Sequence, residues 1–181
     1  MKKLSERTTI ELEDITKEIY ELAGEEFNIS SPKQLGEVLF DKMKIISNPK
    51  KTKTGQYSTS EEVLNELSSK SDLVKLVLKF RSISKLLNTY INSLPKQLDK
   101  YTNRIHTEYV QTVASTGRLS SINPNLQNIP IRTNRGREVR KAFIARNKDY
   151  FLMAADYSQI ELRIIASVSY THLTLPTSRS V

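Results

Sequence analysis

A single carboxylate, Asp156, stands between an apolar run and a helical pattern. The apolar run is Tyr150–Ala155; the polar residues Tyr157-Ser158-Gln159 follow Asp156 and lead into the helical pattern Ile160–Ile165. We expect the run to form a buried strand that ends at Asp156, with a helix starting directly afterwards. A carboxylate at the tip of such a strand is a common way to hold a metal ion against a phosphate group. The pattern therefore indicates phosphate chemistry.

Positive charge is concentrated directly upstream of Asp156. Between residues 132 and 149 only Glu138 and Asp149 oppose the basic residues, which are Arg132, Arg135, Arg137, Arg140, Lys141, Arg146 and Lys148. The whole chain carries 28 Lys and Arg against 20 Asp and Glu, a net charge of +8. Such an excess is compatible with a polyanionic partner or with a solvated basic surface. The local clustering favours a nucleic-acid face.

Composition excludes several classes of site. The 181 residues contain no Cys, so disulfides and thiolate-bound zinc are ruled out, and the presence of only two His argues against a His-rich metal site. No apolar run is long enough to span a bilayer, and no signal-peptide core follows the first residues. We therefore expect a cytoplasmic protein with no membrane partner. Gly-rich phosphate loops, Ser-His-Asp arrangements and HExxH motifs are absent from the sequence.

The first hundred residues carry helical patterns. Residues 1–24 predict a helix that stops at Gly24, and Ser31 with Pro32 is typical of a second helix start. A third helix is expected after Ser58–Glu62. The longest pattern, Asp72–Leu94, predicts a helix about 35 Å long. Its length suits an intramolecular arm better than one side of a coiled coil.

Two polar stretches interrupt these patterns. Asn48–Tyr57 contains Lys50, Lys51 and Lys53 and is either a solvated loop or a flexible fingertip that touches a phosphate backbone. Asn123–Pro130 has two prolines and three asparagines, which excludes a regular helix or a central strand. It is either a floppy connector or a shaped loop that faces a ligand. Between the two we expect one or two strands in Arg104–Ser115 and a turn at Thr116–Ser121.

The octet Asp156–Arg163, DYSQIELR, resembles motif A of family A DNA polymerases. Ala114–Pro130 and the Arg-rich segment through Ala145 look like the stretch that leads to this motif. Three earlier blocks resemble the thumb subdomain of the family: Ala23–Asn28, Ser31–Leu35 and Ser58–Leu64. The similarity is collinear over residues 1 to about 167.

The resemblance implies a mainly helical α+β fold, with a thumb over residues 1–100 and the start of a palm with antiparallel strands over residues 101–167. It also implies a DNA-directed DNA polymerase that adds deoxynucleotides to a primer by two-metal phosphoryl transfer with Mg²⁺, in replication and repair. Asp156 and the Tyr157 carbonyl would bind metal, and Ser158 and Gln159 would lie beside the triphosphate. Glu161 would block the sugar 2′ position, although an acid in a first helical turn is also favoured by the helix dipole alone. Arg163 has either a structural carboxylate or a ligand as its partner.

The family's DNA contacts fall on further residues of this chain. Arg118 resembles an arginine that checks pair shape in the minor groove at the primer terminus. Arg132 and Arg137 are phosphate contacts or structural salt-bridge partners. The resemblance implies primer–template DNA and deoxynucleoside triphosphates as partners of a monomer. The remaining DNA-binding candidates are Asn125, Gln127, Asn128, Lys50, Lys51 and Lys53.

The chain departs from the family after motif A. The fingers helix and the second metal-binding aspartate are not found, and Val168–Val181 resembles a translated sequencing adapter. We therefore expect a gene fragment with an artefactual tail, an exposed apolar edge at Tyr150–Ala155, and no polymerase activity of its own. The alternative from another class is a non-catalytic helical nucleic-acid-binding module in which Asp156 is incidental.

Overall fold

Helix α1 (Lys2–Ala23) begins the chain and buries Ile15 and Ile19 against the rest of the structure. Gly24 ends it in the left-handed conformation (φ 72°), and its N–H donates to the Tyr20 carbonyl at 2.8 Å. Glycine adopts this conformation without a steric penalty, which is why it commonly follows the last helical residue. The helix predicted over residues 1–24 is confirmed.

Two short helices follow, each with a serine cap. Ser31 Oγ accepts the Gln34 N–H at the start of α2 (Pro32–Gly36), which continues as the wider π-helical segment η1 (Glu37–Lys42). Ser60 Oγ accepts the Val63 N–H at the start of α3 (Glu61–Leu67). Both capped starts were predicted because serine satisfies an N–H that has no partner inside the helix.

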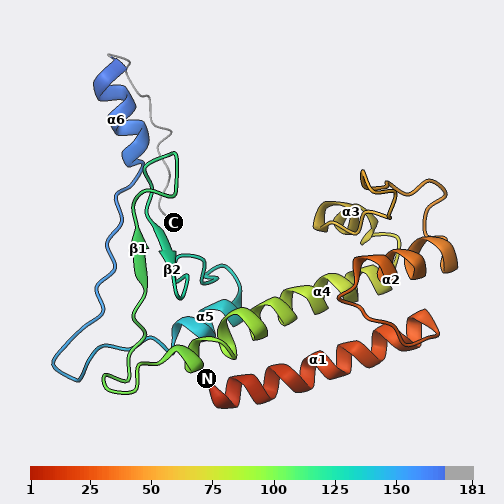
Figure 1. The fold of residues 1–181 in the computed structure, drawn as a ribbon, viewed down its shortest axis with the longest axis horizontal. Coiled ribbons are helices and arrows are strands. Elements are labelled where there is room, and N and C mark those ends of the chain that lie inside the picture. Colours follow the sequence, from red (N-terminus) through yellow and green to blue (C-terminus); the bar gives the residue numbers. More distant parts are fainter. Residues whose placement is uncertain (170–181) are drawn as a thin grey trace, which may run out of the picture. The chain divides into compact units, whose positions relative to one another are not determined.

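Helix α4 (Asp72–Leu86) is the second long helix and packs against α1. It continues as the π-helical segment η2 (Leu87–Ile91), and a 3₁₀ turn, η3 (Leu94–Gln97), contains Pro95. The helix predicted over Asp72–Leu94 is confirmed as far as Ile91, and its hydrogen-bond spacing widens from Leu87 onward. The antiparallel contact with α1 makes the helix an intramolecular arm (Figure 1).

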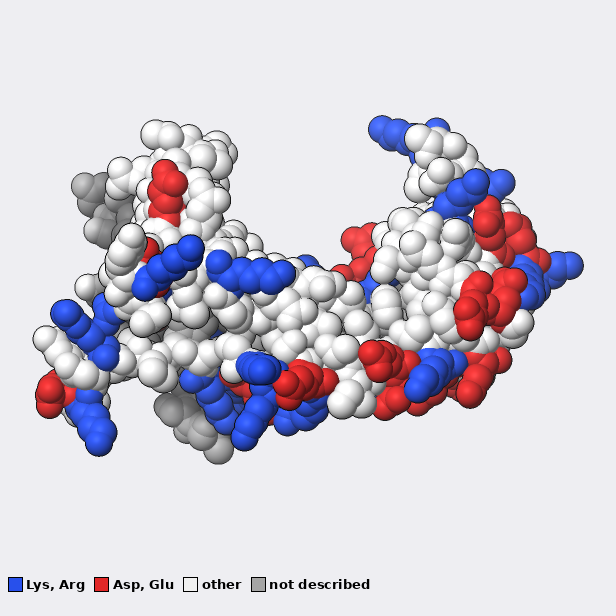
Figure 2. Space-filling model, turned by 60° about the horizontal axis from the view of Figure 1, so that its bottom comes forward, with Lys and Arg blue, Asp and Glu red and all other residues white. Residues whose placement is uncertain are grey.

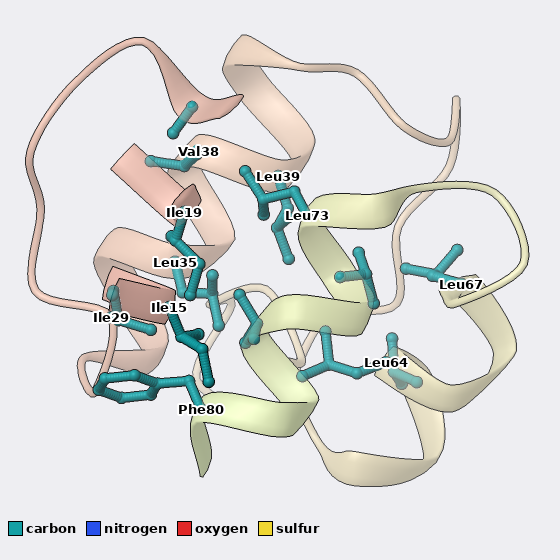
Figure 3. Close-up of a cluster of buried hydrophobic side chains, with 14 of the residues drawn as sticks. Ile15, Ile19, Ile29, Leu35, Val38, Leu39, Leu64, Leu67, Leu73 and Phe80 are labelled. Carbon is teal, nitrogen blue, oxygen red and sulfur yellow. The ribbon is translucent and has the colours of Figure 1, made fainter. Parts of the chain in front are cut away.

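Two clusters of buried apolar side chains stabilise this arm. One joins α1, α2, η1, α3 and α4 (Figure 3), with Ile19, Leu35, Leu39 and Leu64 fully enclosed. The other joins Leu87–Ile91 to Ile129 and Val139. Residues on both sides of position 100 therefore share one cluster. The thumb and palm boundaries stay a prediction.

The small sheet pairs β1 (Glu108–Val110) with β2 (Ser120–Ile122) in antiparallel register, with Tyr109 opposite Ser121. The strand predicted within Arg104–Ser115 is confirmed over three residues. The predicted turn at Thr116–Ser121 is placed too late: the chain reverses around Gly117 (φ 74°), and its last residues already belong to β2.

Helix α5 (Asn134–Arg140) was not predicted from the sequence. Thr133 Oγ1 caps it by accepting the Gly136 N–H at 3.0 Å. Gly136 lies against Pro130 so closely that an added Cβ would be 2.6 Å from the Pro130 carbonyl oxygen. Close approach of two backbones explains the glycine here.

The computed structural model describes residues 1–169 and divides the chain into a unit of Met1–Phe143 and a second unit that begins at Ile144. The second unit contains α6 (Ile160–Ser169), which confirms the helix expected after Asp156. Most of the predicted artefactual tail, residues 170–181, lies outside the described residues. Within residues 1–169, no helix is both long and apolar enough to cross a membrane.

The buried strand expected over Tyr150–Ala155 is wrong for this structure. These residues have no strand pairing and are exposed; Phe151 is 92% accessible. A strand needs a neighbour for its backbone groups, and the described part of this unit offers none. The expected exposure of this apolar run is confirmed.

We predict that Gly136→Ala destabilises the chain by about 1 to 3 kcal/mol, because the added methyl group would force Pro130 away. Helix propensity alone predicts the opposite sign, a gain of about 1 kcal/mol. Urea unfolding of both proteins measures the difference. Lys141→Ala, at an exposed position beside the same helix, serves as the control; a more stable Gly136→Ala variant would contradict the close packing.

Candidate nucleic-acid interface and carboxylate site

The segment Asn123–Pro130, called the Asn loop below, presents three of the predicted DNA-binding residues together. Asn125, Gln127 and Asn128 are all exposed on it. The Asn125 side-chain oxygen accepts the Gln127 N–H at 3.0 Å, which closes a local turn. Of the two alternatives from the sequence, the structure gives a shaped loop.

A chain of hydroxyl groups holds the first half of the Asn loop. The Leu126 N–H donates to Ser121 Oγ at 3.1 Å, and Ser121 Oγ lies 2.7 Å from Thr107 Oγ1. Thr107 Oγ1 in turn lies 2.7 Å from the Pro124 carbonyl oxygen. Either hydroxyl of the Ser121–Thr107 pair can be the donor, and both have the Pro124 carbonyl as a further acceptor, which lies 3.2 Å from Ser121 Oγ. Ser121 is fully buried.

Two further side chains hold the second half of the loop. The Tyr90 hydroxyl of η2 donates to the Asn128 carbonyl at 2.5 Å. The Arg140 guanidinium of α5 donates to the carbonyls of Ile129 (3.0 Å) and Pro130 (3.3 Å). In the sequence Arg140 belongs to a basic cluster. In the structure its side chain donates hydrogen bonds to backbone carbonyls.

Other members of the arginine cluster also have protein partners. Arg135 forms an ion pair with Glu11, and Glu138 forms one with Arg7, so both pairs join α5 to α1. Arg137, predicted as either a phosphate contact or a salt-bridge partner, donates to Asn134 Oδ1 at 2.7 Å within its own helix. Arg132 is exposed, and its role stays a prediction.

A groove of about 1200 Å³ runs between the arm and the Asn loop. Asn125 and Asn128 line one side of it. Along the arm, polar side chains at three- or four-residue spacing line the other side: Ser82, Lys85, Thr89, Ser93 and Gln97. This polar row was not predicted from the sequence, although its three- and four-residue spacing complements that of the apolar face and was the available signal.

Arg118 lies in the same unit, directly after the turn that ends at Gly117 and before β2. Arg118 is exposed and is therefore accessible to a large partner. The predicted contact with a primer terminus is not tested by this geometry.

The three lysines of Asn48–Tyr57 lie on a closed hairpin. Lys51 forms an isolated antiparallel β-bridge with Tyr57, and the Thr52 N–H donates to the Gln56 carbonyl at 2.7 Å. Lys50 Nζ lies 3.3 Å from Glu66, Lys51 Nζ lies 5.3 Å from the centre of the Tyr57 ring, and Lys53 is exposed. The hairpin has a defined turn, and of the two alternatives from the sequence, a solvated loop or a fingertip on a phosphate backbone, DNA contact by its lysines stays a prediction.

Tyr57 anchors this hairpin to the helical core. Its ring packs 5.1 Å from that of Phe40, and its hydroxyl donates to Asp41 Oδ1 at 2.5 Å. The Asp41 carboxylate accepts this hydrogen bond and repels the phenolate, so the pKa of Tyr57 is raised above its ordinary value near 10.

Charge is unevenly divided along the chain. Residues 1–42 contain ten acids and six basic residues, whereas the remainder contains ten acids and 22 basic residues. Over the face in Figure 2, acidic and basic side chains alternate along the helical part. A polyanion is therefore attracted to the later segments, which carry the hairpin, the groove and the Asn loop, more than to α1.

The predicted metal ligand Asp156 is exposed in the second unit, two residues before a turn at Ser158-Gln159. Gln159 has φ 55°, and α6 starts at the next residue. Arg163 donates from its backbone N–H to Gln159 O (3.0 Å) and from Nε to Ser158 O (3.1 Å). Arg163 thus binds a backbone carbonyl of its own segment, and its contact with a structural carboxylate or a ligand stays a prediction.

Glu161 lies in the first turn of α6, as expected, with Tyr157, Ser158 and Gln159 just before the helix. Asp156 and the Tyr157 carbonyl offer hard oxygen atoms, which suit Mg²⁺ in kind. Among residues 1–169 there is no group of three or more His, Asp or Glu side chains that could hold a metal ion. The residues present therefore fit part of a magnesium site. They belong to a different unit from Arg118 and the Asn loop.

Comparison with known proteins places these features in one family. The family model described as DNA polymerase family A matches residues 1–174, a range that runs beyond residue 167, where the resemblance was expected to end. DNA polymerase I of Pseudomonas aeruginosa is 54% identical over 158 residues (86% of this chain, 17% of the relative). DNA polymerase I of Deinococcus radiodurans is 49% identical over 166 residues (92% of this chain, 17% of the relative). The chain spans less than a fifth of the length of these relatives.

A solved structure resembles this one closely. It is the POL domain of Pol1 from M. smegmatis in complex with DNA primer-template and dNTP, with a TM-score of 0.80 and 40% sequence identity. The match covers 93% of this chain and 30% of that domain.

We predict that Asp41→Ala lowers the pKa of Tyr57 toward 10, because the acceptor and its negative charge are lost. Since the folded-state pKa is raised, the stability that this bond contributes is present below pH 10 and is lost as the pH rises through the folded-state pKa. NMR titration of the labelled Tyr57 ring carbon measures the shift. Asp14→Ala, at an Asp paired with Lys17, is the control; an unchanged Tyr57 titration in Asp41→Ala would contradict the hydrogen bond.

Proposed function

This chain belongs to DNA polymerase family A, and from that premise we propose that it is part of an enzyme that adds deoxynucleotides to a primer 3′ end on a DNA template. The observation that carries the proposal is the match of 93% of the chain to a polymerase domain, at a TM-score of 0.80. That relative is in complex with DNA primer-template and dNTP, and we propose partners of the same kind for this chain.

The first unit is proposed to bind the primer–template duplex. Its arm corresponds to the thumb, and the polar row that includes Lys85 and Thr89 faces the groove beside the Asn loop. Amide groups such as those of Asn125 and Gln127 can donate to minor-groove acceptors, which A·T and G·C pairs have in common. Arg118 would make a contact of the same kind, and Lys50, Lys51, Lys53 and Arg132 would bind phosphates.

The second unit is proposed to supply chemistry. Asp156 and the Tyr157 carbonyl would hold magnesium, which in two-metal phosphoryl transfer activates the primer oxygen and stabilises the leaving group. Ser158 and Gln159 would bind the triphosphate as hydrogen-bond donors. Glu161 would exclude a sugar 2′ hydroxyl by occupying its space, which selects deoxynucleotides.

Taken alone, the 181-residue chain is proposed to bind DNA as a monomer in the cytoplasm without extending a primer. In the described residues 1–169 no group of three or more acidic or His side chains could hold a metal ion, which supports this, since two-metal catalysis needs several acidic ligands. The biological context proposed for the whole enzyme is DNA replication and repair.

We predict that Asp156→Ala abolishes primer extension while primer–template binding is retained. The test protein is a chimera in which residues 1–167 replace the matching segment of the M. smegmatis domain. Loss of a metal ligand should lower the extension rate by about a thousandfold, since metal coordination supplies several kcal/mol of transition-state stabilisation.

Asp149→Ala is the matched control, because it removes another exposed carboxylate from the same unit seven residues earlier. It should leave extension unchanged. Undiminished extension by the Asp156→Ala chimera would remove the catalytic assignment and leave the alternative, a binding module in which Asp156 is incidental.

We predict that Glu161→Ala in the same chimera raises the use of ribonucleotides relative to deoxynucleotides by about tenfold or more, because the space for a 2′ hydroxyl is opened. Competition between the two sugar forms of one nucleotide measures the ratio. Glu161→Gln keeps the volume and removes the charge, so it should retain most of the selectivity. Equal selectivity in the wild-type and Glu161→Ala chimeras would rule out the steric role.

A further inference from the structure

The Asn loop is held almost entirely by side chains that bind its backbone. Carbonyls at Pro124, Asn128, Ile129 and Pro130 and the N–H of Leu126 all have side-chain partners. The partners come from four places in the sequence, and we call them the loop clamp: Tyr90, Thr107, Ser121 and Arg140. Because the clamp binds backbone atoms, the side-chain amides of Gln127 and Asn128 remain exposed.

We propose that the loop clamp positions the Asn loop for DNA, so that its members are positioning residues for primer–template binding. This inference rests on the proposed function, since it assumes that the loop amides contact the duplex. A loop without regular secondary structure loses backbone freedom when it binds, and this loss weakens binding. A loop already fixed by its own protein avoids most of that loss.

The burial of the clamp side chains indicates whether they act through the loop or by direct contact with DNA. Ser121 is inaccessible, and Tyr90 lines the groove with only 6% of its surface accessible. The Tyr90 hydroxyl donates to the Asn128 carbonyl, so its effect on affinity is expected to pass through the loop. Arg140 is exposed and cationic, so its substitution would also change attraction to phosphates, and it is unsuited to the test.

Tyr90→Phe is the most selective variant, because it removes one hydroxyl and keeps the buried ring. The chain contains a matched control: the Tyr20 hydroxyl donates to the Phe27 carbonyl at 3.0 Å, the same kind of bond at a distant loop. Both substitutions remove one tyrosine-to-carbonyl hydrogen bond, so their effects on thermal stability should be similar. Only Tyr90→Phe should affect DNA binding.

The experiment measures fluorescence anisotropy of a labelled primer–template duplex with the 181-residue chain. Tyr90→Phe should weaken binding by about three- to tenfold, the range that one hydrogen bond supports. Tyr20→Phe should leave the affinity unchanged. The slope of affinity against salt should be the same in all three proteins, because no phosphate contact is removed. Thr107→Val, which breaks the hydroxyl chain with little change in volume, should behave like Tyr90→Phe.

A double-mutant cycle then tests whether Tyr90→Phe weakens DNA binding through the side chains of the Asn loop. Gln127→Ala removes a proposed contact, and in that background Tyr90→Phe should cost less affinity than in the wild type, because part of what it positions is gone. Additive losses would overturn the positioning role, as would equal losses in Tyr90→Phe and Tyr20→Phe.

The outcomes distinguish failure of the positioning role from failure of the proposed DNA-binding function. Binding that weakens with Gln127→Ala but not with Tyr90→Phe overturns the positioning role alone. A wild-type chain that does not bind primer–template DNA overturns the proposed DNA contact and the positioning role with it.

Discussion

The packing of α1 against α4 is the contact on which the first unit depends. Leu12 of α1 packs against both apolar clusters, so the two cores are joined along this helix pair. One cluster fixes α2, α3 and the lysine hairpin, and the other fixes η2 to the segment around Ile129 and Val139. The helix pair thus sets the distance between the hairpin and the Asn loop, because each is anchored to a different part of it. Apolar burial gives this scaffold most of its stability.

Polar contacts fix the conformation of the Asn loop on this scaffold. In the Asn loop Ile129 is buried and Leu126 packs partly against the same cluster, so the hydrophobic effect fixes two points of the loop and leaves the rest free. The hydroxyl chain through Ser121 and the guanidinium of Arg140 supply direction as well as attraction, since hydrogen bonds weaken steeply with angle. In the buried surroundings of Ser121, an unmade bond would be costly, which favours one arrangement of the loop over others.

The helices could be predicted because their signals are local. Gly24, Ser31 and Ser60 act within four residues of their own position, and the apolar spacing of α4 identifies its buried face. Helix α5 could not be predicted: it is mainly polar, and its ion pairs with Glu11 and Arg7 join residues more than 120 positions apart. The strand expected at Tyr150–Ala155 failed for the related reason that pairing depends on a neighbour, which an apolar pattern does not reveal. Likewise, the nearness of Asn125, Gln127 and Asn128 follows from their sequence, whereas Tyr90 is 38 residues from the carbonyl it binds.

The two candidate sites differ in how completely this chain builds them. In the first unit, the Asn loop and the groove are formed by contacts among segments far apart in the sequence, so their geometry is a property of the folded chain. In the second unit, Asp156 and Glu161 take their places from one turn and the start of one helix, beside exposed apolar side chains such as Phe151 and Met153. Local geometry of that kind can set the order of the groups along the chain but cannot bring several carboxylates to one ion. The contacts that build the groove and the Asn loop do not involve Asp156, so the proposed DNA-binding surface and the proposed metal site can be altered independently.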